Sequence, residues 1–130
     1  MSMHWALLIA VAFGSAIGGV ARFLIREYLP LWLNVDFPIG TLTVNVIGCL
    51  LAGVLMSYWQ AVIVSPVFKA AILVGFLGAL TTFSSFSVDT LALVQEQNYA
   101  KAGLNIFVNM TFSLIAVFFG AWIGGKLAPN

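Results

Sequence analysis

Four long hydrophobic stretches, separated by short gaps that contain polar residues or proline, organise this sequence. They run over residues 5–26, 40–62, 67–95 and 100–126. Each stretch reaches the length of about 20 residues that a helix needs to cross about 30 Å of hydrocarbon. The pattern predicts an all-α membrane protein with four transmembrane helices, in a single domain over residues 1–130.

The gaps contain the residues that end helices. Pro30 and Pro38 lie between the first two stretches, and Ser65-Pro66 opens the third, with the proline in the first helical turn. The first stretch has no Lys or Arg before it and no obvious cleavage site after it. We therefore expect it to be a retained span rather than a signal peptide.

Composition narrows the class of protein further. The chain has 130 residues, of which 62% are hydrophobic and 7% are charged, whereas soluble domains have about 25% charged residues. This excludes a water-soluble globular fold. The formal net charge of +1 gives no bulk attraction to nucleic acid, so no nucleic-acid partner is expected. The single cysteine, Cys49, excludes an intrachain disulfide.

Positive side chains are divided almost evenly between the two sides of the predicted membrane domain. Arg22, Arg26 and Lys101 lie on one side, and Lys69 and Lys126 on the other. The positive-inside rule then sets no clear orientation. Either the chain inserts both ways, so that two copies pair antiparallel, or a weak bias orients it weakly.

Pairs of glycines four residues apart occur in the first and fourth stretches. Gly14 and Gly18 form one such pair, and Gly120 and Gly124 form another. This spacing lets helix backbones approach closely. Every protein with several spans needs such faces, so the motif by itself does not indicate a dimer.

Polar side chains follow helical spacing inside the second and fourth stretches. Thr41 and Asn45 lie one turn apart, and Asn105, Asn109 and Ser113 form a stripe along one face. Such groups are costly in hydrocarbon unless they are hydrogen-bonded or line a cavity. A single asparagine favours hydrogen bonding between packed helices. Two aligned stripes favour a polar pathway.

The third stretch contains the most unusual segment, GFLGALTTFSSFSVD at residues 75–89. Two glycines precede five hydroxyl residues that alternate with Phe83 and Phe86. This composition predicts a broken helix at mid-membrane depth, which is tolerated where it is buried or lines water. Exposed carbonyls at such a break bind cations, and amide and hydroxyl donors bind anions. The phenyl rings either present their positive edges to a small anion or are packed core.

Enzymatic chemistry is not indicated. No metal-ligand motif, no catalytic triad and no pair of carboxylates occurs in the spans, and the hydroxyls have no base to activate them. We expect a protein that is not an enzyme.

The motifs GTLTVNVIG at 40–48 and GFLGALTTFSSFS at 75–87 resemble the Fluc (CrcB-type) fluoride channels of bacteria. The similarity extends to GSAIGGVARF at 14–23 and LNIFVN at 104–109, and so covers nearly the whole chain. The resemblance implies a multi-pass protein of the bacterial inner membrane that exports fluoride passively. It also implies an antiparallel, dual-topology homodimer with two pores, surrounded by membrane lipid.

The resemblance also implies roles for individual residues. The implied fluoride pathway consists of Thr41, Asn45, Phe83, Ser84, Ser85, Phe86, Asn109 and Ser113. A structural sodium ion (Na⁺) at the dimer centre would be held by the backbone carbonyls of Gly78 and Thr81. Arg22 matches an arginine near the end of the first span, with a vestibule or structural role.

Three positions depart from the family pattern. Ala79 replaces an expected glycine, Ser85 replaces a threonine, and Asp89 stands where a glutamate is common. The main rival function is a small four-span, proton-coupled multidrug exporter, which needs an ionisable acid inside a span. Asp89 is the only candidate in the third span, and the first two spans contain none. A scaffold protein that uses its polar stripes only for packing is a third alternative.

Overall fold

The computed structural model describes residues 2–130, and every regular element in that range is a helix. The predicted domain starts at residue 1, which lies outside the described residues. In chain order the elements are α1 (Met3–Leu33), α2 (Ile39–Tyr58), α3 (Pro66–Lys69), the π-helix η1 (Ala70–Leu77), α4 (Gly78–Leu80), α5 (Phe83–Gln95) and α6 (Tyr99–Leu127).

Four helical segments are long and apolar enough to cross a membrane. They are Met3–Leu33, Ile39–Tyr58, Pro66–Gln95 and Tyr99–Leu127, and the third is the composite of α3, η1, α4 and α5. The surface fits this assignment, because large apolar side chains such as Phe13, Trp32 and Phe118 are each at least 70% exposed. The prediction of a four-span, all-α membrane protein is confirmed at this level.

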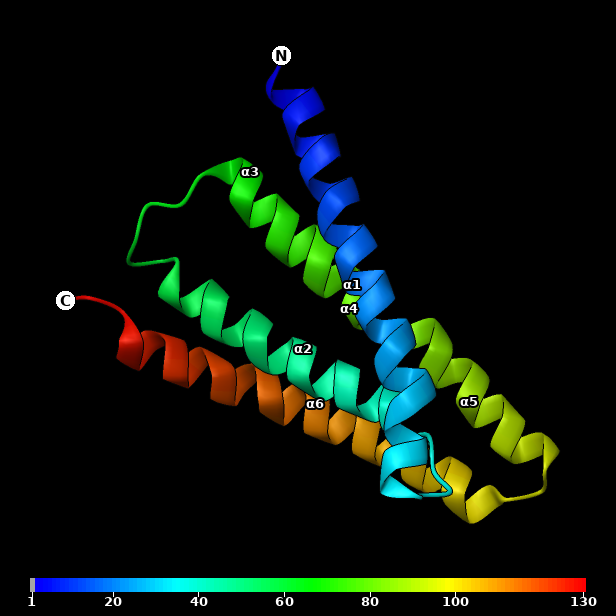
Figure 1. The fold of residues 1–130 in the computed structure, drawn as a ribbon. Helices are drawn as coiled ribbons and strands as arrows, with labels where there is room; N and C mark the ends of the chain where they lie inside the picture. Colours follow the sequence, from blue (N-terminus) through cyan, green and yellow to red (C-terminus); the bar gives the residue numbers. More distant parts are fainter. Residues whose placement is uncertain (1) are drawn as a thin grey trace.

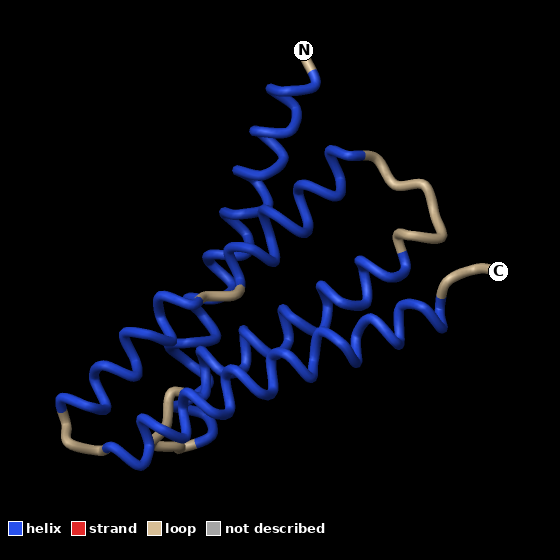
Figure 2. The backbone as a smooth tube through the Cα atoms, turned by 180° about the vertical axis from the view of Figure 1, so that it is seen from behind, coloured by secondary structure: helices blue, strands red, loops and turns tan. Residues whose placement is uncertain are grey.

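Two helix pairs form the body of the molecule. α2 and α6 lie side by side over most of their length, and α1 packs along η1 (Figures 1 and 2). α5 diverges from η1 beyond the break and packs against the first part of α6. A small apolar core of Val44, Leu77 and Leu80 lies where these elements meet.

Glycines allow the backbones to approach closely in both helix pairs. A Cβ atom on Gly14 or Gly18 would collide with the backbone carbonyl of Ala71 or Phe76 in η1. On the other pair, a Cβ on Gly120 or Gly124 would collide with the carbonyl of a residue in α2. The two GxxxG motifs therefore act within one chain, where they allow close backbone contact between neighbouring spans.

The first helix is longer than the sequence predicts. Pro30, expected to lie in a linker after residue 26, falls inside the last turn of α1. Proline lacks an N–H, but its carbonyl still accepts from the backbone N–H groups of Asn34 and Val35. The helix ends at Leu33, and the residue that caps it, Asn34, has a left-handed φ of 50°. α2 also ends earlier than expected, at Tyr58, and a turn leads to Ser65.

The third span is broken where the sequence predicts. Thr81 (ψ 153°) and Thr82 (φ −155°, ψ 116°) are extended, and α5 begins at the next residue. The Thr82 hydroxyl accepts from the Ser85 N–H at 3.0 Å and caps α5. The predicted opening of this span is also confirmed, because the Ser65 hydroxyl caps α3 by accepting from the Phe68 N–H.

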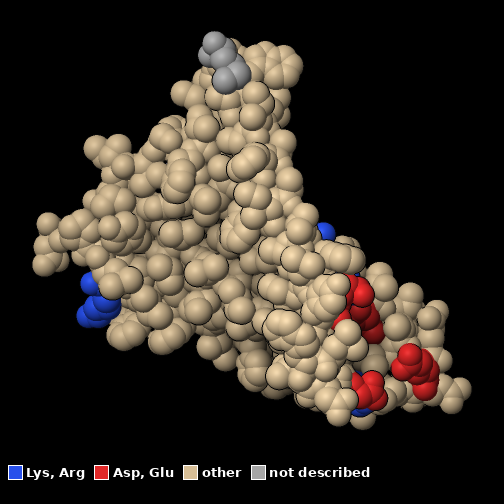
Figure 3. All heavy atoms as spheres, viewed as in Figure 1, with Lys and Arg blue, Asp and Glu red and all other residues tan. Residues whose placement is uncertain are grey.

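The charges lie towards the ends of the molecule, and the two ends differ. α1 ends, and α6 begins, at the end where α5 also ends (Figure 1). Glu27, Asp36, Asp89 and Glu96 belong to this end, and Figure 3 shows acidic side chains gathered there. We call it the acidic end.

Candidate functional site

Asn45 on α2 is hydrogen-bonded to the break in the third span. Its side-chain oxygen accepts from the Thr82 N–H at 2.7 Å, and its Nδ2 donates to the Thr82 carbonyl at 3.2 Å. One amide side chain thus satisfies both backbone groups of an extended residue inside the membrane domain. This two-point contact explains how irregular backbone is tolerated at this depth.

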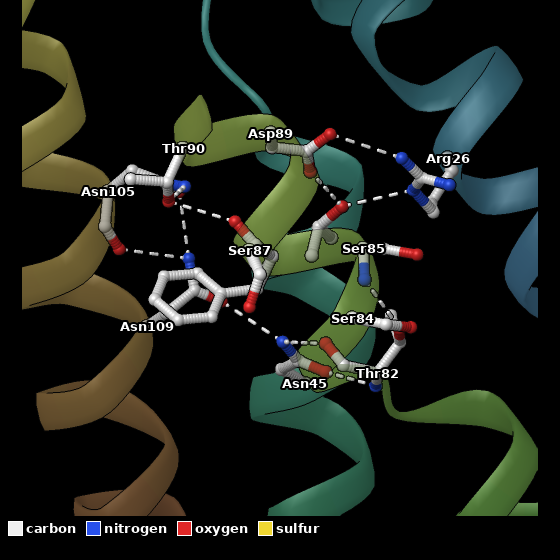
Figure 4. Close-up of polar contacts among 12 residues, drawn as sticks. Arg26, Asn45, Thr82, Ser84, Ser85, Ser87, Asp89, Thr90, Asn105 and Asn109 are labelled. Carbon is white, nitrogen blue, oxygen red and sulfur yellow. Dashed lines mark hydrogen bonds and ion pairs between the residues drawn. The ribbon is translucent and has the colours of Figure 1, made fainter. Parts of the chain in front are cut away.

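From Asn45, hydrogen-bonded side chains continue across α6 to α5. Asn45 Nδ2 also donates to Asn109 Oδ1 at 3.1 Å, and Asn109 Nδ2 donates to Asn105 Oδ1 at 2.9 Å. Asn105 Nδ2 then donates to the Thr90 hydroxyl at 3.0 Å. We call Asn45, Asn109, Asn105 and Thr90 the amide chain, and Figure 4 shows its links.

A hollow of about 290 Å³ opens beside the amide chain at the break, and we call it the inner hollow. Its wall brings together side chains from α2, the break, α5 and α6. The lining residues are Asn45, Cys49, Thr81, Thr82, Phe83, Phe86, Asn109, Met110, Ser113 and Leu114. Five of the residues predicted for the pathway therefore meet around one space, namely Asn45, Phe83, Phe86, Asn109 and Ser113.

The two phenylalanines form an edge-to-face pair. Their ring centroids are 5.2 Å apart and the ring planes meet at 68°. Phe86 is 6% exposed, whereas Phe83 is 70% exposed at the surface of the single chain. Their differing burial shows that only one ring is packed core, so the alternative that both are core is excluded for the single chain.

A second polar cluster lies towards the acidic end. Arg26 Nε donates to the Thr41 hydroxyl at 3.0 Å, and Arg26 Nη2 lies 3.2 Å from Asp89 Oδ1. The Thr41 hydroxyl donates in turn to Asp89 Oδ2 at 2.6 Å. Thr41, predicted for the pathway, therefore belongs to this cluster, and it does not line the inner hollow.

Ser84, Ser85 and Arg22 also lie outside the wall of the inner hollow. Ser84 is an exposed residue whose hydroxyl lies 3.3 Å from that of Thr82, and the Ser85 N–H takes part in the cap of α5. Arg22 is half-buried on α1. Their predicted roles remain predictions, as do the roles of the residues that line the hollow.

The carbonyls predicted to bind sodium lose their usual helical donors at the break. In a continuous helix the Thr82 N–H would donate to Gly78 and the Ser85 N–H to Thr81. Here the Thr82 N–H donates to Asn45 and the Ser85 N–H to the Thr82 hydroxyl. Both carbonyls thus have capacity for a cation, and Gly78 is exposed on the single chain. These groups fit a hard cation, which prefers oxygen ligands.

Three residues to which the sequence assigns no individual role in the site complete it. Thr82 caps α5 and contacts Asn45, Thr90 ends the amide chain, and Arg26 pairs with Asp89. The signal for Thr82 was its position three residues before Ser85, within a hydroxyl run at a helix start. The partner of Arg26 lies 63 residues away, and sequence spacing gives no sign of it.

The polar groups of the site are mutually satisfied. Among residues 2–130, no buried side-chain nitrogen or oxygen lacks a hydrogen-bond partner. An anion that enters the inner hollow would have to share donors that already donate to acceptors within the protein. Its binding would therefore be weak and its release rapid. This arrangement suits passage better than storage.

The fold and the site define a class: a four-span membrane protein with a hydrogen-bonded polar site at a broken third helix. Residues 9–121 match the family model described as CrcB-like protein, Camphor Resistance (CrcB). The chain belongs to this family, and it is a multi-pass membrane protein.

Curated relatives have one name in common. A protein of Aliivibrio salmonicida called "Fluoride-specific ion channel FluC" is 50% identical over 118 residues, which are 90% of this chain and 94% of that protein. Its namesake in Photobacterium profundum is 49% identical, covering 90% and 93%. The one in Shewanella oneidensis is 48% identical, covering 87% and 91%. This chain is therefore similar to these proteins over nearly their full length.

Proposed function

We propose that this chain is a fluoride-selective channel that lets fluoride leave the cytoplasm passively across the bacterial inner membrane. The family and the names of its relatives support the proposal. The observation that carries it is the inner hollow, where Asn45, Asn109 and the edge-to-face pair Phe83 and Phe86 surround one space.

The chemistry of the wall suits a small anion. Fluoride is strongly hydrated, so several donors must replace its water molecules as it enters. Neutral amide and hydroxyl groups supply donors without a buried cation that would hold the anion too tightly. A phenyl ring adds its positive edge. The edge-to-face geometry points an edge of one ring at the face of the other and leaves further edges free.

We further propose an antiparallel, dual-topology homodimer with two pathways. Phe83 is 70% exposed on the single chain, and Ser84 and Gly78 beside the break are exposed too. Hydroxyl and backbone groups facing lipid are costly, so a second copy covering this surface is favoured. The nearly even division of the basic residues, three against two, is compatible with insertion in both directions.

A sodium ion at the dimer centre is the proposed structural cofactor. The carbonyls of Gly78 and Thr81 would hold it, because the break deprives both of a helical donor. The ion would supply positive charge and cross-link the two broken helices. The residues of this chain that prepare the site are Asn45 and Thr82, which divert the two N–H groups.

The channel proposal also implies that the protein is not an enzyme, and it is favoured over a proton-coupled multidrug exporter. An exporter needs a carboxylate that is free to exchange a proton for a cationic drug. Asp89, the acid of the third span, is instead paired with Arg26 and hydrogen-bonded to Thr41. A scaffold protein would have no need for a hollow lined by Asn45, Asn109 and the ring pair.

Fluoride efflux from liposomes containing the purified protein, read with a fluoride electrode, tests this function. We expect fast efflux that chloride does not share. Phe83→Ile removes the ring edges of this residue at the inner hollow. It should reduce the rate of efflux at least about tenfold, which corresponds to a rise of about 1.4 kcal/mol in the barrier.

Phe118→Ile is the matched control. Phe118 is 73% exposed on α6, close to the 70% of Phe83, but it does not line the inner hollow. Its replacement should leave efflux unchanged. Efflux no faster than from empty vesicles, with folded protein present, would refute the channel.

Cross-linking of oppositely oriented copies in vesicles tests the dimer separately.

A further inference from the structure

We propose that Arg26 is a positioning residue of the anion pathway, which neutralises Asp89 and turns its carboxylate away from the amide chain. The inference rests on the proposed function, since it concerns passage of an anion. It is carried by the cluster of Arg26, Thr41 and Asp89, whose three contacts of 2.6–3.2 Å link α1, α2 and α5.

Asp89 lies between two spaces. It lines an outer hollow of about 320 Å³ at the acidic end, together with Pro30, Pro38 and Glu96. On α5 it stands three residues, about one turn, beyond Phe86, which lines the inner hollow. Its next neighbour is Thr90, the last member of the amide chain. An acid is therefore built in at the junction of the outer hollow and the amide chain.

An acid at this position opposes the passage of an anion. Two like unit charges a few ångströms apart repel each other strongly where water is scarce. The Asp89 side chain is only 17% exposed, so solvent screens it weakly. Arg26 Nη2 supplies the opposing charge at 3.2 Å, and the pair is neutral as a unit.

The contacts of Arg26 also fix where the carboxylate points. Its Nε donates to Thr41, which donates to one carboxylate oxygen, while its Nη2 donates to the other. Both oxygens of Asp89 are thereby engaged from the side of α1 and α2, as Figure 4 shows for the Arg26 contacts. The planar guanidinium offers several donors in a fixed geometry, whereas a lysine ammonium cannot reproduce both contacts.

The other charged groups near the outer hollow do not replace Arg26. Asp36 and Glu96 line that hollow and add negative charge. Lys101 pairs with Asp36 at 2.9 Å, at a site where the Asp36 side chain is fully exposed. Among residues 2–130, Arg26 is the cation that pairs with Asp89, so its removal would leave the acid uncompensated.

Fluoride efflux from liposomes at neutral pH separates this role from a merely structural one. Arg26→Gln should slow efflux about tenfold or more, because it leaves a poorly screened carboxylate beside the pathway. The double variant Arg26→Gln/Asp89→Asn removes both charges and should recover efflux to within about threefold of wild type, as coupled residues do. Arg26→Lys keeps the charge but loses one contact, and efflux should be intermediate.

Lys101→Gln is the matched control, because it removes the cation of the other ion pair at the same end. That pair is exposed, and efflux should stay within about twofold of wild type. Recovery in the double variant supports the inference. A double variant as slow as Arg26→Gln, or an Arg26→Gln variant as fast as wild type, overturns it. If Arg26→Gln does not fold, Arg26→Lys and the double variant decide in the same way. A wild-type protein without efflux refutes the proposed function instead.

Discussion

The two halves of α6 meet the same partner, α2, in opposite ways. Both halves use one continuous face of the helix. The half towards the acidic end, which we call the amide half, buries Asn105 and Asn109. The other half, which we call the glycine half, buries Gly120 and Gly124. The glycines bring the two backbones together, with the Leu50 and Val54 carbonyls of α2 directly over them. At the asparagines the contact is made by side chains instead, because Asn45 of α2 donates to Asn109, which in turn donates to Asn105 on the same helix.

This difference shows how a small membrane protein holds a polar site firmly. Backbone contact along the glycine half resists sliding of α6 against α2, because close-packed interiors are hard to compress and transmit strain. The amide half is thereby held in register with the break in the third span. The glycine half supplies rigidity, and the amide half supplies chemistry.

The largest expected effect comes from breaking the glycine half. Gly120→Leu forces a side chain into the Leu50 carbonyl and must push α2 and α6 apart. Overpacking typically costs about 1–3 kcal/mol, and a side chain forced against a backbone carbonyl should reach the upper end of that range. The thermal unfolding midpoint in detergent should fall sharply, or the folded protein should fail to accumulate.

Gly125→Ala serves as the control for Gly120→Leu. Gly125 lies on the same helix, but a Cβ there would meet nothing within 4 Å. Alanine is the better helix former by up to about 1 kcal/mol. The midpoint should therefore stay or rise slightly. An unfolding midpoint of Gly120→Leu equal to that of wild type would refute the rigid contact.

The second-largest expected effect comes from a change in the amide half. Its cost in stability is smaller, but its effect on fluoride efflux is large. Asn109→Leu removes the link between Asn45 and Asn105 and leaves both with an unmet group. Loss of a buried partner costs about 1–3 kcal/mol. Fluoride efflux should fall at least about tenfold, while the protein remains folded.

Met110→Leu is the matched change for Asn109→Leu. Met110 lines the same hollow from the same helix, and the swap nearly conserves apolar volume. Efflux should stay close to that of wild type. Equal losses in the two variants would show that the hollow responds to any substitution, and the amide chain would then have no special role.

The sequence predicts much of this division of α6 into an amide half and a glycine half, for physical reasons. Helical spacing aligned Asn105 and Asn109 with Ser113, and the glycine pairs predicted close contact, because both follow from the period of the helix. Glycines placed before hydroxyl residues predict a break within residues 75–89, and the structure locates it at Thr81 and Thr82. These predictions depend on residues that are near one another in the chain.

The rest depended on contacts between distant residues. Pro30 is a local exception: a proline predicts a linker there, yet its carbonyl still accepts hydrogen bonds from the N–H groups of Asn34 and Val35 in the last turn of α1. The family resemblance implies a pathway role for Thr41, which stays a prediction, and its hydroxyl contacts Arg26 and Asp89 on two other helices. No periodicity within one helix specifies such partners. Only the packing of α1, α2 and α5 brings them together.

The smallest expected effect lies at the boundary between the two halves of α6. Ser113 lines the inner hollow one turn after Asn109 and just before Ala116, where the small-residue contacts begin. The inner hollow beside it has a volume of about 290 Å³, which leaves room for a water molecule to replace the hydroxyl in Ser113→Ala. We expect efflux to fall about twofold, and stability to change by less than about 0.5 kcal/mol. Thr111→Val, a hydroxyl removal on the same helix away from the hollow, should change neither. A loss in Ser113→Ala as large as in Asn109→Leu would extend the functional half of α6 to Ser113, because the anion would then depend on a donor at the last polar position before the glycines.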